Sequence, residues 1–170
     1  MKEGVRILAV DDVPFSKGDP STLLVGVVLR KGVMEHVLYR RIEIDGEDST
    51  EAIKDMLSDR PLKEQTKVVF LDGMTFGGLN IVDMKELAKE CRGVIAVHKE
   101  GRGTMEEVVM RLFPRRVGLL KHPTIRIRNR VVAYEGIDAD EIEGYLDYGL
   151  YGLNLAHKIG KGLGEWIRRY

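Results

Sequence analysis

Long apolar runs mark several segments of the chain as strands of a sheet. Residues 4–10, 68–71 and 93–97 are apolar almost throughout. Unbroken runs of this length are typical of strands that are covered on both faces. Residues 22–29 are rich in Val and Leu, and residues 34–44 alternate between apolar and polar positions. The short Gly-containing turn between these last two runs predicts a β-hairpin.

The remaining segments show the spacing and the capping residues of helices. A first helix is expected after an N-cap at Asp48, Ser49 or Thr50. Further helices are predicted over residues 81–90, where Asn80 or Asp83 can start the helix, and over residues 104–113 and 138–148, with a short hairpin about Asn129 before the last of them. Beyond residue 148 the apolar positions still recur at helical spacing, although the tail contains Gly160, Gly162 and Gly164.

The order of these elements predicts one α/β domain that spans residues 1–170. Three β runs come first, and helices then alternate with strands before the hairpin and the final helices. An antiparallel layer followed by βαβ units gives a mixed sheet with helices on its faces. This order resembles the ribonuclease H-like fold, in which the first and fourth strands are adjacent and parallel.

Two of the predicted buried strands end in aspartate. Asp11 follows the first strand, and Asp72 follows the strand at residues 68–71. Ligands of open α/β sheets bind outside the carboxyl ends of parallel strands, so both carboxylates are candidates for chemistry. Like charges at close range are costly unless a cation lies between them, and oxygen ligands suit Mg²⁺ or Mn²⁺. The alternative is that both residues cap turns, as Asp commonly does before Gly or Pro.

The charges of the chain balance overall but are unevenly distributed. The sequence contains 27 basic and 27 acidic residues, so its total charge favours no class of partner. No acidic residue occurs between Val108 and Tyr134, whereas Arg115, Arg116, Arg126 and Arg128 all lie there. Such a segment is a candidate contact surface for the phosphates of a nucleic acid.

Cysteine usage and hydropathy bear on the cellular setting of the protein. Cys91 is the single cysteine, so the chain forms no internal disulfide, and a reduced cytoplasmic setting is expected. No apolar run approaches the length of a signal sequence or a membrane span, so we expect no membrane partner.

Three motifs stand out along the chain: residues 9–15 around Asp11-Asp12, residues 72–83 around Asp72-Gly73, and Leu155-Ala156-His157. These motifs resemble the uncharacterised archaeal relatives of endonuclease V (domain of unknown function family ninety-nine). Endonuclease V is a Mg²⁺-dependent nuclease of ribonuclease H-like fold that cleaves nucleic acid near deaminated adenine. The resemblance therefore implies metal-assisted phosphodiester hydrolysis by this chain.

The same resemblance assigns roles to individual residues. It implies that Asp11 and Asp72 are metal ligands and that Lys99 counters charge on the phosphate during hydrolysis. The family's catalytic acid opens the first long helix, which points to Asp48 as the third carboxylate and to Glu51 as the alternative. The cofactor is then Mg²⁺ or Mn²⁺.

The chain departs from endonuclease V at the parts that recognise inosine. Residues 41–48 contain no Pro-Tyr-Ile-Pro wedge, and the His-Pro-Arg segment that follows the Asp-Gly pair in endonuclease V is absent. A histidine that supports metal binding in that family is replaced by Ile137. The resemblance therefore implies a diverged nuclease without preference for inosine.

The remaining candidate residues concern substrate binding. Gly77 and Gly78 could cradle a phosphate on their backbone N–H groups, and Asn80 either contacts substrate or holds this loop. The arginines at 115, 116, 126 and 128 would bind the nucleic-acid backbone. The alternative function is a nucleic-acid- or nucleotide-binding module that has the same fold and no catalytic activity. The oligomeric state is left open.

Overall fold

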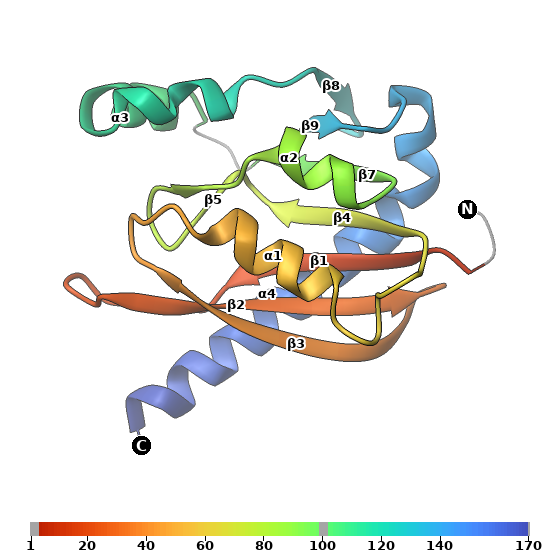
Figure 1. The fold of residues 1–170 in the computed structure, drawn as a ribbon, viewed down its shortest axis with the longest axis horizontal. Coiled ribbons are helices and arrows are strands. Elements are labelled where there is room, and N and C mark those ends of the chain that lie inside the picture. The colour runs from red at the N-terminus through yellow and green to blue at the C-terminus, as the bar shows by residue number, and fades with distance from the viewer. Residues whose placement is uncertain (1–3, 99–101, 170) are drawn as a thin grey trace.

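A seven-stranded mixed sheet forms the centre of the molecule in a computed structural model that describes residues 4–98 and 102–169 (Figure 1). The strand order is β3-β2-β1-β4-β7-β9-β8. These strands are β1 (Arg6–Asp12), β2 (Ser21–Arg30), β3 (Val33–Glu43), β4 (Lys67–Asp72), β7 (Gly93–Val97), β8 (Thr124–Ile127) and β9 (Arg130–Glu135). β1 is parallel to β4, and β4 is parallel to β7, while the other neighbouring pairs are antiparallel. The predicted mixed sheet and the predicted pairing of the first and fourth strands are confirmed.

Helices cover the two faces of this sheet and explain the unbroken apolar runs. Leu8 and Val10 of β1 point into one hydrophobic core, and Ile7 and Ala9 point into the other. α1 (Ser49–Leu57) and α2 (Met84–Leu87) supply side chains to the first core, and α4 (Ala139–Arg169) supplies them to the second. Figure 1 shows α1 and α2 on one side of the sheet and α4 crossing behind it. Successive strand residues face opposite sides, so a strand buried on both sides must be apolar throughout.

Of the two residues that could start the helix predicted at residues 81–90, the structure uses Asp83, so the helix begins after residue 81. β5 (Thr75–Phe76) and β6 (Asn80–Ile81) form a small antiparallel hairpin that uses the start of this segment. The helix follows an N-cap at Asp83, whose carboxylate accepts the backbone N–H of Glu86 at 3.1 Å. It continues into a 3-10 turn, η1 (Ala88–Glu90). None of the described helices combines the length and the apolar character that a membrane span requires.

One helix replaces the final helix and the helical tail that the sequence predicts separately. α4 runs for 31 residues, and Gly149, Gly152, Gly160 and Gly164 are buried along its sheet-facing side. A Cβ at Gly149 would lie 2.2 Å from the ring of Phe70, and these glycines therefore let α4 lie closer to the sheet than larger residues would. The remaining helical segments, α3 (Arg102–Leu112) and η2 (Pro114–Leu120), lead to β8.

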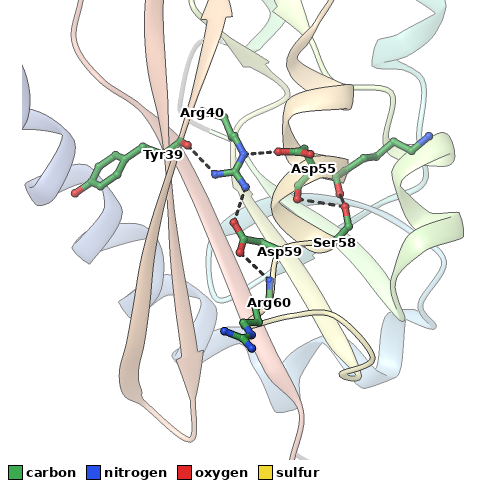
Figure 2. Close-up of polar contacts among 7 residues, drawn as sticks. Tyr39, Arg40, Asp55, Ser58, Asp59 and Arg60 are labelled. Atoms are coloured by element: carbon green, nitrogen blue, oxygen red, sulfur yellow. Dashed lines mark hydrogen bonds and ion pairs between the residues drawn. The ribbon is translucent and has the colours of Figure 1, made fainter.

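An arginine joins the edge strand β3 to α1 (Figure 2). Arg40 donates to Asp55 of α1 and to Asp59, which follows α1, at 2.6 Å in each case. A further N–H of the guanidinium donates to the carbonyl oxygen of Tyr39 at 2.8 Å. The hydrogen bond from Arg40 holds the pKa of Asp59 below its usual value. This cluster joins the C-terminal end of α1 to the edge of the sheet.

Candidate metal centre

The pairing of β1 with β4 brings two aspartates together at one edge of the sheet. Val10 of β1 lies beside Leu71 of β4, so the next residues in this register are Asp11 and Asp72. Asp11 lies two residues after Ala9 and Asp72 two residues after Phe70, and both Ala9 and Phe70 belong to the core on the α4 side. Because residues i and i+2 of a strand share a face, both aspartates point toward that helix. Asp11 is buried, and Asp72 is partly exposed. The predicted meeting of these two carboxylates is present in the structure.

His157 of α4 completes a group of three side chains. Its Nδ1 lies 3.1 Å from a carboxylate oxygen of Asp11. One ligand atom from each of Asp11, Asp72 and His157 lies within 4.8 Å of the others, a spacing that suits coordination of one metal ion. The histidine side chain is 59% exposed while that of Asp11 is 5% exposed, so the group opens toward solvent on the histidine side. A substrate could therefore reach it.

The environment of Asp11 opposes a negative charge on its own. Burial is the main cause that raises the pKa of Asp11 from 3.8 to about 7, and the neighbouring charge of Asp72 adds to it. The backbone N–H of Asp12 donates to Asp11 at 2.8 Å and acts in the opposite direction. A bound cation would compensate both carboxylates at once. Two carboxylates and one imidazole are a donor set that fits Mn²⁺ or a partly hydrated Mg²⁺.

We expect the stability of the metal-free protein to fall between about pH 4 and pH 7 through Asp11. The folded protein keeps a proton on this group that the unfolded chain releases, so the stabilisation is complete below the unfolded pKa and is lost as pH rises through 7. At pH 8 in EDTA, Asp11→Asn should stabilise the protein against urea by on the order of 2–3 kcal/mol, with little effect at pH 4.

The difference between the unfolding free energies of the variant and the parent, measured across this range, isolates Asp11 from the other titrating groups. Adding Mn²⁺ should stabilise the parent more at pH 8 than at pH 5, because the ion competes with the proton. A difference that does not change with pH would contradict the raised pKa of Asp11.

Asp48, the expected third carboxylate, takes part in a hydrogen-bond network at the start of α1. It accepts the backbone N–H of Glu43 at 3.2 Å and the side-chain amide of Asn80 at 2.7 Å. α1 packs on the face of the sheet opposite α4, whereas Asp11 and Asp72 point toward α4. Within residues 4–98 and 102–169, the group of potential metal ligands therefore contains neither Asp48 nor the alternative Glu51, which is exposed on α1 beside Lys54.

Asn80 is a buried residue that organises the loops around β6. Its side-chain oxygen accepts the N–H of Ser49 at 3.1 Å, and its amide donates to the carbonyl of Glu43 at 2.9 Å. Its exposed fraction is 0%, so it connects the start of α1 to the end of β3 and is out of reach of solvent. Of the two roles considered for Asn80, holding the loop is the one that its contacts support.

Gly77 and Gly78 form the turn of the β5–β6 hairpin. Their φ angles are +53° and +79°, a left-handed conformation that glycine adopts without strain. The N–H of Gly77 donates to Asp12 at 2.7 Å, and the N–H of Leu79 donates to Asp45 at 2.8 Å. Carboxylates of the protein thus occupy donors that a phosphate would need, while the proposed contact of this turn with substrate stays a prediction.

The four candidate arginines differ in their surroundings. Arg116 donates to the carbonyl oxygens of Asp45 and Leu79, and its guanidinium lies 3.9 Å from the ring centre of Phe113. Arg128 occupies the turn between β8 and β9 and pairs with two acidic residues of α4, so its charge is compensated. Arg115 and Arg126 are exposed.

The structure also bears on the predicted arginine stripe, and it leaves the predicted role of Lys99 untested. The turn at residues 128–129 breaks the extended arginine stripe that an uninterrupted strand would form through residues 126–130. Lys99, the expected phosphate-binding lysine, lies outside the described residues.

In the sequence, His157 belongs to one of the motifs but has no predicted role in metal binding. Ile137, which stands where the resemblance expects a supporting histidine, is 7% exposed and packs against Gly93. His157 instead reaches the carboxylates from α4. Its signal was its place next to Ala156 in the small-residue stripe of the helix, because that stripe turns toward the sheet.

The sheet, its two flanking layers and the carboxylates at adjacent strand ends define a ribonuclease H-like α/β protein with a candidate metal centre. The chain belongs to the endonuclease dU family, whose model matches residues 3–146. His157 lies beyond the matched segment.

Archaeal proteins are similar to this chain along much of its length. A UPF0215 protein of Methanocaldococcus jannaschii is 29% identical over 177 aligned positions, which cover 95% of this chain and 96% of that protein. A UPF0215 protein of Methanothermobacter thermautotrophicus is 42% identical over 91 residues, or 52% of this chain and 45% of that protein.

Two solved structures share the fold. A protein of unknown function from Archaeoglobus fulgidus has a TM-score of 0.80 and 26% identity, covering 93% of this chain and 97% of that one. Endonuclease V of Ciona intestinalis, solved with DNA that contains inosine, has a TM-score of 0.53 and 14% identity, covering 96% and 86%. The chain therefore shares its fold with endonuclease V and belongs to the endonuclease dU family.

Proposed function

We propose that this protein is a metal-dependent endonuclease that hydrolyses phosphodiester bonds in nucleic acid. The observation that carries the proposal is the group formed by Asp11, Asp72 and His157 at the carboxyl edge of two parallel strands. Membership of the endonuclease dU family supports the class of reaction. Each of the three residues comes from a different element, so the fold itself creates the group.

The three residues would divide the work between holding the ion and admitting the substrate. Asp11 is fixed by the N–H of Asp12 and by His157, which makes it a rigid ligand. Asp72 is partly exposed and would face the substrate side. A bound divalent ion would lower the pKa of a water molecule and offset charge on the scissile phosphate. Lys99, which follows β7 beside β4, is proposed to add positive charge near that phosphate.

The substrate proposal combines the family description with the missing recognition segments. The name of the family, endonuclease dU, points to deoxyuridine in a DNA strand as a candidate target. Residues 41–48 contain no Pro-Tyr-Ile-Pro wedge, and recognition of an extruded base needs a fitted pocket and groups that separate the strands. We therefore propose that the protein does not prefer inosine.

The test compares matched oligonucleotides that contain one deoxyuridine, one deoxyinosine or neither. Purified protein is incubated with each, single-stranded and duplex, in Mn²⁺, Mg²⁺ or EDTA. We expect metal-dependent cleavage that is at least as strong for the deoxyuridine strand as for the deoxyinosine strand. Asp140→Asn, which changes an exposed carboxylate in the first turn of α4, serves as the control for Asp72→Asn.

Three outcomes separate the candidate functions. Cleavage that Asp72→Asn removes and Asp140→Asn preserves would support the endonuclease. A strong preference for deoxyinosine would show that the missing wedge does not decide specificity. Binding without cleavage of any strand would favour the nucleic-acid-binding module, a reading that the structural role of Asp48 also supports because it leaves only two carboxylates among the grouped ligands of the described chain.

A further inference from the structure

A cleft of about 320 Å³ is lined by residues that follow Asp11 and His157 along the chain, among them Val13 and Gly164. Its walls come from the segment after β1, the start of β2, the end of β3 and the last turns of α4. Its apolar lining includes Val13, Phe15, Leu23 and Ile167, and two arginines, Arg41 and Arg168, stand at its rim.

We propose that this cleft binds one nucleotide of a nucleic-acid strand, with the base against Phe15 and the backbone phosphate between Arg41 and Arg168. The inference rests on the proposed endonuclease function, since it names where a nucleotide next to the cleaved position is held. None of Phe15, Arg41 and Arg168 is predicted from the sequence to bind substrate.

The two arginines carry the first argument. The Nε of Arg41 donates to the hydroxyl of Ser21 at 3.1 Å, and the Nε of Arg168 donates to the carbonyl of Gly164 at 3.3 Å. Neither forms an ion pair with a carboxylate in the part of the chain that the structure describes. Arg128, in contrast, is compensated by two carboxylates. Exposed guanidinium groups without a carboxylate are available to the phosphates of a strand.

The distribution of charge along α4 also favours binding of a nucleic-acid strand at the cleft. Before His157 the helix carries only acidic charged residues, at Asp140, Glu141, Glu143 and Asp147. After it come Lys158, Lys161, Arg168 and Arg169 against the single Glu165. Glu141, Glu143 and Asp147 are paired with Arg92 and Arg128, so the first half of the helix offers a nucleic-acid strand no net positive charge. The second half, where the cleft lies, carries a net positive charge that attracts the strand.

The apolar lining suits a base. Phe15 is 40% exposed and Ile167 is 47% exposed, so both present large apolar surfaces to solvent at the cleft. Aromatic side chains in basic grooves are stacking platforms for single-stranded bases of any sequence. The volume lies at the lower end of the range for small-molecule pockets, which fits one nucleotide. Asp19, also in the lining, accepts the N–H of Ser16 at 2.7 Å and so closes the turn beside Phe15.

The distance to the metal centre fits a strand that occupies both places. Gly164 lines the cleft and follows His157 by seven residues of α4, which corresponds to roughly 10 Å along a helix. Stacked nucleotides rise about 3.4 Å each, so the cleft should hold a nucleotide about three positions from the cleaved phosphate.

The test uses binding in EDTA, so that it does not depend on metal or cleavage. A fluorescein-labelled 12-nucleotide single strand is titrated with the full-length protein at low salt, and anisotropy gives the dissociation constant. We expect Phe15→Leu to weaken binding about tenfold through lost stacking, and Arg41→Gln with Arg168→Gln to weaken it further and to flatten the salt dependence. The matched controls Tyr151→Leu, an exposed aromatic of α4, and Arg60→Gln should leave affinity unchanged.

A second measurement keeps the unaltered protein. Strands that carry 5-iodouracil at one position at a time are irradiated in complex with it, and the cross-linked peptide is identified by mass spectrometry. We expect a peptide containing Phe15, whether or not the strand is also cleaved. Cross-links elsewhere, affinity that Phe15→Leu does not change, or no binding at all would each overturn the proposal. Sedimentation showing a dimer that Phe15→Leu dissociates would assign the cleft to a second copy and would also overturn it.

Discussion

Replacing Asp72 with asparagine is expected to reduce metal-dependent cleavage on the order of a thousandfold. The substitution keeps the shape of the side chain and removes one of the two charges that would hold the ion beside Asp11. Divalent-metal binding measured by calorimetry should fall with it, because ligation to oxygen depends on carboxylate charge. Titration of Mn²⁺ into both proteins at pH 8 is the direct measurement.

Asp48→Asn is the informative comparison, since the resemblance to endonuclease V implies the same role for Asp48. Asp48 accepts hydrogen bonds from Asn80 and from the backbone of Glu43, so its replacement should lower stability and leave metal affinity nearly unchanged. If Asp48→Asn removes Mn²⁺ binding as completely as Asp72→Asn does, the group of ligands proposed here is wrong.

Gly149→Ala should destabilise the protein by about 3 kcal/mol, the upper part of the range for overpacked cores. The added Cβ would lie 2.2 Å from the ring of Phe70, and that ring is fully buried in β4. Either the ring leaves its rotamer or α4 moves away from the sheet. Urea unfolding followed by circular dichroism measures the change in free energy.

Gly162→Ala provides the opposite control in the same helix. A Cβ at Gly162 has no neighbour within 4 Å, and alanine has the higher helix propensity, so this variant should gain up to about 1 kcal/mol. Equal effects of the two substitutions would mean that the close approach of α4 to β4 does not restrict residue 149.

The sheet and its carboxylates could be predicted from local patterns. Strands buried on both faces have unbroken apolar runs, and such runs predict β1, β4 and β7 from the sequence. Because parallel neighbours share an edge, the aspartates that end the first two runs had to meet once the strands were known to pair. These inferences need only the two-residue repeat of a strand and the position at which each apolar run ends.

The parts that the sequence did not reveal depend on how distant segments pack. Asp48 precedes the first long helix as the family pattern requires, but it accepts a hydrogen bond from the side chain of Asn80, a contact across 32 residues that no local pattern could reveal. The late start of α2 has a similar cause, because residues 80–81 pair with β5 before the helix begins. His157 is also undetectable as a ligand until the glycine stripe of α4 is known to face the sheet.

The candidate metal centre is complete only after the last helix of the chain has docked on the sheet. The two carboxylates lie on the sheet, but the histidine arrives with the last helix, 146 residues after Asp11 in the sequence. Local opening of α4 would take His157 away while leaving the carboxylates paired, so the affinity for the ion contains the free energy of docking that helix. Bound metal would in turn slow hydrogen exchange in α4, because the ion would stabilise the docking of this last helix against the sheet.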